Sequence, residues 1–336
     1  MPFDVSDLRI TGEPVLLQAD GYSPSVAADG TLVLLPAAFG AQQRLGWLER
    51  SGLSGEPLSR ESSGMRDIRL SPDGRRAAAT VTTGGNPELW VFDTTRLDER
   101  RLTFNPAPDT RPAWVANGKG IAYICGNGLC TMSLDGAVRP QTLLPDNVIQ
   151  VSATSDGAHL LVARRPKNSL ADLFVVDTRS EGMAVAAATP RPLIAAPRVQ
   201  GQADVSPDGR YVAYQSNESG RFEIYVARFP SGEGKWDVSR GTGTMPRWNA
   251  TGDRLFFVDD LSRIVEVDVE LTPSFSAGPR RVAVDARAAG ANPARDGFDR
   301  SLDGQRFLVA RSPIEARRLA SIHVVENWLA VYGGAR

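Results

Sequence analysis

The sequence contains very little histidine and cysteine, with two residues of each among 336. Because His159 and His323 are the only imidazoles, a metal site built on three histidines is excluded, and enzymes that depend on one are disfavoured. A lone histidine on a strand is commonly a surface residue or a core residue whose hydrogen bonds are satisfied. Neither histidine therefore marks a catalytic site by itself.

There is also no excess of charge of either sign, since 38 basic and 39 acidic residues leave a net charge of −1. This balance gives no overall attraction to nucleic acid or to an anionic membrane. No apolar run approaches the roughly 18 residues of a transmembrane helix, and the first residues lack the basic and apolar regions of a secretory signal. The expected location is the cytoplasm as the chain is written, or an extracytoplasmic one if it is a fragment of a membrane-anchored parent.

Familiar catalytic motifs are missing as well. The strings nearest to a G-x-S-x-G nucleophile elbow, GYSPS and GLSG, fail its spacing. Neither the H-E-x-x-H zinc motif nor a P-loop nor G-x-G-x-x-G occurs. These absences favour binding over chemistry, although carboxylates alone can still serve an enzyme.

The two cysteines lie close together in the stretch YICGNGLCTM. Asn127-Gly128 favours a type I′ hairpin turn, which would place Cys125 directly opposite Cys130 at a non-hydrogen-bonded pair. That separation is near the lower end of what a disulfide accepts. The pattern is compatible with a disulfide and with a pair of reduced thiols. Two thiols with no nearby histidine make only an incomplete metal site.

What the sequence does contain is a repeated turn, in which a small residue or serine precedes Asp-Gly or a variant of it. Its glycines are spaced by 39 to 52 residues, near the period of roughly 40–45 residues of a propeller blade. The seven copies are AADG at 27–30, SPDG at 71–74, ANGK at 116–119, TSDG at 154–157, SPDG at 206–209, ATGD at 250–253 and SLDG at 301–304. Because aspartate caps such turns through backbone amides, Asp73, Asp208 and Asp303 are predicted to be turn residues.

Short β-branched and aromatic strands follow each turn, which predicts an all-β chain forming one seven-bladed β-propeller of four-stranded blades over residues 1–336. GEPVLL at 12–17 resembles the outer strand GEPLS at 55–59, so we expect the two termini to share one blade. The alternative is six blades plus irregular terminal strands. The expected blades are 21–60, 64–104, 109–145, 148–196, 200–241, 244–285, and 297–328 together with 1–17.

These repeats resemble the TolB-like propellers, which are related to WD-type repeats. The likeness covers essentially the whole chain and is carried by SPDGRRAAATVTTGGNPELWVFD at 71–93, SPDGRYVAYQSNESGRFEIYVARFP at 206–230 and KWDVSRGTGTMPRW at 235–248. The chain is most similar to the propeller behind a membrane segment in bacterial serine/threonine-kinase-linked proteins. The resemblance implies a binding or scaffolding role.

In such a fold the strand entering each turn is the innermost of its blade, so polar residues just before the turn are expected to line a central channel. The candidates are Asp67, Arg69, Asp109, Arg111, Gln200, Gln202, Asp204, Arg247, Asp299 and Arg300. Their oxygens suit calcium or magnesium, and their arginines suit an acidic ligand. The alternative is a water-filled channel whose polar groups pair with each other.

The leading functional hypothesis is a non-catalytic scaffold, expected to be monomeric and without a cofactor beyond the calcium or magnesium named above. It would bind a protein or small ligand at the channel mouth or through the stretches 179–203 and 285–297. The competing hypothesis is a channel-sited lyase or metal-assisted hydrolase that uses the aspartates and arginines. We expect neither binding to nucleic acid nor insertion into a membrane.

Overall fold

The computed structural model describes residues 3–4, 9–10, 22–26, 32–36, 42–137, 139–154, 156–165, 170–178, 189–194, 198–312 and 323–325. The sequence predicts one domain, whereas the structure divides the chain into two units. The larger unit is Gln43–Ser312, and the smaller one combines Met1–Gln42 with Pro313–Arg336. In the part of the chain described, no helix has the length and apolar character needed to cross a membrane.

Four antiparallel sheets of four strands each fill the middle of the larger unit, and in each the strands pair in chain order. Sheet 3 contains β11 (Asp109–Val115), β12 (Gly120–Cys125), β13 (Gly128–Ser133) and β14 (Gln141–Leu144). Sheet 4 contains β15 (Val148–Ala153), β16 (His159–Arg164), β17 (Asp172–Asp177) and β18 (Arg191–Ile194). Sheet 5 contains β19 (Gln200–Val205), β20 (Tyr211–Ser216), β21 (Glu223–Arg228) and β22 (Trp236–Asp237). Sheet 6 contains β23 (Thr244–Trp248), β24 (Arg254–Val258), β25 (Arg263–Glu270) and β26 (Ser276–Asp285).

Eight further strands form two more groups of four, which are joined by pairing of β5 with β7. Sheet 2 contains β7 (Ser62–Leu70), β8 (Arg76–Thr83), β9 (Asn86–Asp93) and β10 (Glu99–Arg101). Sheet 1 contains β27 (Phe298–Arg300), β28 (Arg306–Arg311), β5 (Gln42–Glu49) and β6 (Gly52–Ser54). The all-β fold class is therefore confirmed.

The pairing at the two ends of the chain corrects the predicted one. The predicted blade of 297–328 and 1–17 leaves the strand at 306–311 to pair within that blade, but β28 pairs instead with β5, for example Leu308 with Trp47. Both strands are buried on both faces, so β28 needs a full-length partner. The eight residues of β5 supply a longer hydrogen-bond ladder than the three of β29 (His323–Val325). Sheet 1 is thus built from the two ends of the larger unit.

The smaller unit contains two short sheets. One pairs β1 (Phe3–Asp4) with β2 (Arg9–Ile10), and the other has the order β29, β4 (Leu32–Pro36), β3 (Tyr22–Val26). The predicted first blade joined β4 to β5, whereas β4 pairs with β3 and β29. The predicted outer strand at 12–17 lies outside the described residues.

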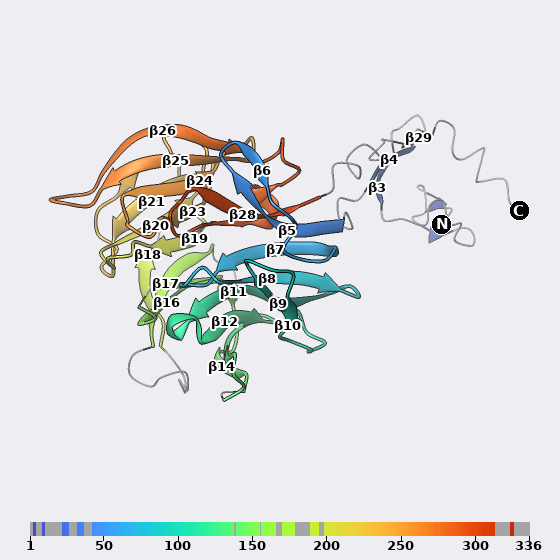
Figure 1. Ribbon diagram of the computed structural model, residues 1–336, viewed down its shortest axis with the longest axis horizontal. Coiled ribbons are helices and arrows are strands. Elements are labelled where there is room, and N and C mark those ends of the chain that lie inside the picture. The colour runs from blue at the N-terminus through green and yellow to red at the C-terminus, as the bar shows by residue number, and fades with distance from the viewer. Residues whose placement is uncertain are drawn as a thin grey trace, which may run out of the picture. The chain divides into compact units, whose positions relative to one another are not determined.

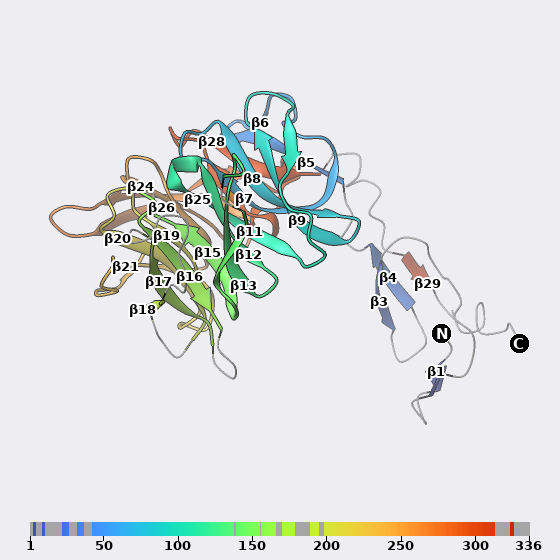
Figure 2. The same cartoon turned by 90° about the horizontal axis from the view of Figure 1, so that it is seen from below.

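Apolar clusters lie between neighbouring sheets of the larger unit, because each sheet is apolar on both faces and must be covered on both. Sheets 2 and 3 share Leu89 and Ile121, and comparable clusters join sheets 1 and 2, 3 and 4, 4 and 5, and 5 and 6. Sheet 6 also packs on sheet 1, where the Phe256 and Phe307 ring centroids are 5.3 Å apart. Figures 1 and 2 show the sheets succeeding one another around a common centre.

The repeated turns adopt the predicted aspartate-capped form. Ser71 Oγ donates to Asp73 Oδ1 at 2.6 Å and the Arg75 N–H donates to the same oxygen, while Gly74 takes a φ of +72°, which suits glycine. The hydrogen bond from Ser71 holds the pKa of Asp73 below its usual value. Asp208 and Asp303 accept the same bond from Ser206 and Ser301. The turn role of all three aspartates is confirmed.

Candidate functional site

The first strands of all six sheets, β7, β11, β15, β19, β23 and β27, line one cavity of ≈ 240 Å³. In every sheet, the residue five positions before the turn glycine forms part of its wall. The same position of each repeat therefore lies at the same level of the cavity. The six residues there are Arg69, Ala113, Ser152, Asp204, Arg247 and Asp299. Pro72, Pro207 and Leu302 of the turns lie at the same cavity. We call it the central cavity.

A second, smaller cavity of ≈ 20 Å³ is lined at the position seven residues before each turn glycine. The six residues there are Asp67, Arg111, Gln150, Gln202, Met245 and Gly297. Arg69 and Arg247 contribute to both cavities. The two cavities therefore occupy successive levels along the same inner strands.

The inner strands are bulged at this second level. Pairing shifts between Arg66 and Arg69 and between Gly201 and Asp204, and the left-handed φ values are +58° at Asp67 and +46° at Gln202. A non-glycine residue in this region costs roughly 1–3 kcal/mol and persists only where neighbours hold it. Here the Gln202 N–H donates to Gln150 Oε1 of the preceding sheet.

The bulge makes the same contact in other sheets. The Arg111 N–H donates to Thr80 Oγ1 at 3.1 Å, and the Met245 N–H donates to Gln215 Oε1 at 3.3 Å. Each bond joins an inner strand to the preceding sheet. The hydrogen bonds of the bulges thus connect neighbouring sheets beside the small cavity.

The two aspartates of the central cavity also bridge adjacent sheets. Asp204 Oδ2 accepts the Trp248 N–H at 2.8 Å, and Asp299 Oδ2 accepts the Leu70 N–H at 2.8 Å. Asp299 Oδ1 accepts the Arg300 N–H as well. One oxygen of each carboxylate is therefore committed to holding the inner strand of the next sheet.

Side chains one position further along also donate to the inner strand of an adjacent sheet. Trp114 Nε1 donates to the Arg69 carbonyl at 2.9 Å, and Trp248 Nε1 donates to the Asp204 carbonyl at 3.1 Å. Arg300 Nε donates to the Trp248 carbonyl at 2.6 Å. Both tryptophans are also buried in the apolar clusters between neighbouring sheets.

Burial changes the titration of the Asp204 carboxyl group. Burial raises the pKa of Asp204 to about 6, although the Trp248 N–H and the Arg300 and Arg69 guanidinium groups act in the opposite direction and Asp299 adds to the rise. A carboxyl group with this pKa changes charge close to neutral pH. The central cavity therefore carries a different net charge at pH 5 and pH 7.

Eight of the ten predicted channel residues line one or both cavities, and two do not. Asp109 stands at the start of β11, is 1 % exposed and accepts from Asn105 Nδ2 at 2.8 Å. Burial raises the pKa of Asp109. Gln200 is likewise buried at the start of β19. Both precede the bulge of their strand, and neither lines either cavity.

The sequence reasoning also missed two polar residues, Gln150 and Ser152, which line the small and central cavities. Gln150 Nε2 donates to Gln202 Oε1 at 2.6 Å, and Ser152 Oγ donates to the Ala203 carbonyl at 2.7 Å. Both belong to the repeat that ends in TSDG. Counting back from Gly157 by the spacing of the other repeats would have found them.

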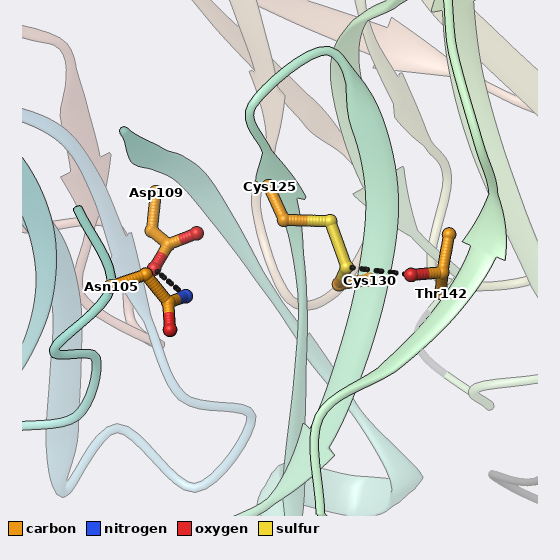
Figure 3. The surroundings of a disulfide bond; sticks show 5 residues. All are labelled: Asn105, Asp109, Cys125, Cys130 and Thr142. Carbon is orange, nitrogen blue, oxygen red and sulfur yellow. Dashed lines mark hydrogen bonds between the residues drawn. A yellow bond between two sulfur atoms is a disulfide. The ribbon is translucent and has the colours of Figure 1, made fainter. Parts of the chain in front are cut away.

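The two cysteines form a disulfide on the β12–β13 hairpin, with a Cα–Cα distance of 5.9 Å (Figure 3). The predicted register was wrong, because Cys125 pairs with Gly128 and Cys130 pairs with Tyr123. The two-residue turn is Gly126-Asn127, with a φ of +61° at Gly126. The disulfide therefore runs diagonally across the hairpin, beside Thr142 on one side, and Asp109 lies opposite Cys125 in β11.

Neither the described residues of the predicted binding stretches nor His159 lines the central cavity, and His323 belongs to the smaller unit. Of 179–203, residues 179–188 and 195–197 are outside the described residues, and the rest contains β18 and the start of β19. The stretch 285–297 contains helix α1 (Pro293–Asp296), which is held by a bond from Gln43 Nε2 to Asp296. His159 is buried edge-to-face on Phe229 at 5.5 Å and lines a separate cavity.

Part of the chain is similar in sequence to known proteins. No family model matches the chain. Over 92 residues, 27 % of the chain, it is 33 % identical to the Tol-Pal system protein TolB of Anaeromyxobacter sp. (strain K), and to that of Anaeromyxobacter dehalogenans (strain 2CP-C). Each match spans 21 % of the relative, so the chain spans about a fifth of the length of the curated relatives it matches.

Solved structures show the likeness over most of the chain. A TolB structure from Agrobacterium tumefaciens superposes with a TM-score of 0.61 at 15 % identity, covering 82 % of this chain and 100 % of that one. TolB from Acinetobacter baumannii gives 0.52 at 13 % identity, covering 87 % and 67 %. At these identities the likeness is one of fold. The narrower resemblance to kinase-linked proteins stays a prediction.

Proposed function

We propose that this TolB-like β-propeller is a non-catalytic scaffold that binds a protein partner at the mouth of its central cavity. The observation that carries the proposal is the convergence of six inner strands on one polar cavity, with the apolar side chain of Leu302 43 % exposed at its rim. An apolar rim around convergent polar groups is a common setting for recognition. The name of the curated relatives, a protein of the Tol-Pal system, agrees with a role among other proteins.

We further infer that the ring has six blades, one for each of sheets 1 to 6. The apolar cluster between sheets 6 and 1 supports closure within the larger unit. Closure there would use β27 and β28 together with β5 and β6, in place of a blade shared by the outermost termini. A ring of this kind leaves only short outer edges open to solvent.

The competing enzyme hypothesis is not favoured. The carboxylates that a lyase or hydrolase would need, Asp204 and Asp299, each use an oxygen to hold the neighbouring sheet. Within the described ranges, no three histidine, cysteine, aspartate or glutamate residues are placed to hold a metal ion. Calcium or magnesium in the cavity stays an untested prediction.

Site-specific photo-crosslinking tests the scaffold. A photoreactive amino acid placed at Leu302, on the cavity rim, is expected to give a discrete protein adduct in cells of the source organism. The matched position is Leu97, which is 60 % exposed in the turn after β9 and does not line the cavity. Equal adducts at both positions, or none at Leu302, would contradict the proposal.

A further inference from the structure

Three arginines that line the two cavities have no carboxylate partner among the described residues. Arg300 lies 3.5 Å from Asp299, and Arg66 lies 3.6 Å from Asp67. By contrast, none of the ion pairs formed by described residues includes Arg69, Arg111 or Arg247. Arg69 acts on Asp204 only from beyond ion-pair distance, where it lowers the pKa of that carboxyl group, so these three guanidinium groups have no close counter-charge.

Arg247 is the most buried of them. It is 5 % exposed, and its Nε is buried without a hydrogen-bond partner. Its Nη1 donates to the Pro246 carbonyl at 2.5 Å, and its guanidinium carbon lies 5.9 Å from the centre of the Phe298 ring. A buried guanidinium without a counter-charge is unfavourable unless an anion approaches it. Arg247 borders both cavities, so an anion can reach it there.

The charges around the central cavity are unequal. Three guanidinium groups line it, from Arg69, Arg247 and Arg300, against two carboxylates, from Asp204 and Asp299. With both carboxylates ionised, the wall has an excess of one positive charge. One negative charge therefore completes the balance, whereas a dianion would exceed it and be repelled by both aspartates.

The volume sets the size of the anion. The central cavity of ≈ 240 Å³ has room for about eight water molecules, at roughly 30 Å³ each. That space accommodates one acidic side chain or a small organic acid, and not a folded domain. The guanidinium fork matches the two oxygens of a carboxylate.

We propose that Arg69 and Arg247 form a binding site for a single carboxylate group inside the central cavity. The carboxylate belongs to an acidic side chain of a peptide or to a small organic acid. The site deepens the proposed scaffold function and rests on it only where the carboxylate is part of the protein partner. Arg69 faces the ligand from sheet 2, and Arg247 faces it from sheet 6.

Isothermal titration of the full chain tests the site with three probes. These are acetyl-Gly-Glu-Gly-amide, the matched acetyl-Gly-Gln-Gly-amide, and butyrate, which carries a single negative charge. We expect the glutamate peptide or butyrate to bind, and the glutamine peptide to bind at least about tenfold more weakly. Tighter binding of the peptide or of butyrate identifies which source the site prefers.

Two variants locate the binding. Arg247→Gln and, separately, Arg69→Gln are expected to weaken the carboxylate probe at least about tenfold. The Arg69 variant keeps the test informative if Arg247→Gln fails to fold. Arg111→Gln is the matched control, because Arg111 is also unpaired but lines only the small cavity. Equal binding of the glutamate and glutamine peptides, or unchanged binding in the Arg69 variant, would overturn the proposal.

The two proposals fail separately. If no carboxylate probe binds but the Leu302 adduct forms, the carboxylate site is wrong and the scaffold stands. If butyrate binds through Arg69 and no adduct forms at Leu302, the site stands and the protein-binding role is wrong.

Discussion

The residues at one position of the repeat differ in what their side chains do. Five residues before the turn glycine, Asp204 and Asp299 accept backbone N–H groups of the next sheet, whereas Arg69 and Arg247 pair with no carboxylate of the described chain. The same backbone geometry therefore carries two kinds of side chain. The aspartates hold the sheets together, and the arginines leave positive charge facing the cavity.

Substitution of Asp204 by asparagine tests the charge state of this layer. Its pKa of about 6 lies above the 3.8 of the unfolded chain, so the folded protein binds the extra proton between these pH values. The stability that this gives is fully present below pH 3.8 and is lost as the pH rises through 6. Asp204→Asn keeps an acceptor for the Trp248 N–H but does not titrate. Relative to the variant, the native protein should lose on the order of 2–3 kcal/mol over this range.

Urea unfolding of both proteins at pH 4, 5, 6 and 7 measures this difference. Carboxylates common to both proteins cancel, so the pH dependence of the difference belongs to Asp204. A difference that stays constant across the four pH values would show that Asp204 has an ordinary pKa.

At the scale of elements, the sequence located the hairpin of the cysteines but misplaced its turn. Asn-Gly suggested a turn at Asn127-Gly128, whereas the turn residues are Gly126 and Asn127. The resulting change moves the partner of Cys125 by two residues, from Cys130 to Gly128. Because side chains alternate with a period of two, both cysteines still share a face and meet diagonally.

Removal of the disulfide should have a modest effect. The cysteines are five residues apart, so the loop that the bond closes in the unfolded chain is short. The chain-entropy relation gives about 2 kcal/mol for Cys125→Ser combined with Cys130→Ser, measured by urea unfolding. Native protein treated with a reductant is the control and should lose the same amount. Two free thiols in the untreated native protein would contradict the bond itself.

Within the whole molecule, local repetition was predictable and ring closure was not. Each expected range from 64–104 to 244–285 holds one four-stranded sheet, with sheet 2 beginning two residues earlier. Their strands pair with sequence neighbours, and turn residues mark every boundary. Pairing of β28 with β5 joins residues more than 250 positions apart, and the local pattern of neither strand specifies its partner. The charged residues of the cavity could be predicted from their position just before the repeated turn. Which of the arginines form no ion pair could be learned only from the positions of the side chains.

Truncation distinguishes closure inside the larger unit from closure by the outermost termini. A fragment of residues 42–312 retains every strand of sheets 1 to 6, so it is expected to be a monomer that unfolds cooperatively in urea. A blade built from 297–328 and 1–17 would keep only its strands before residue 312 in this fragment. The matched control is residues 56–312, which lacks only β5 and β6 in addition. There β28 loses β5, one of its two partner strands, and exposes Leu308, so aggregation or loss of the cooperative transition is expected. If circular dichroism and size-exclusion chromatography show both fragments unfolded, the ring is not closed by β5 and β28.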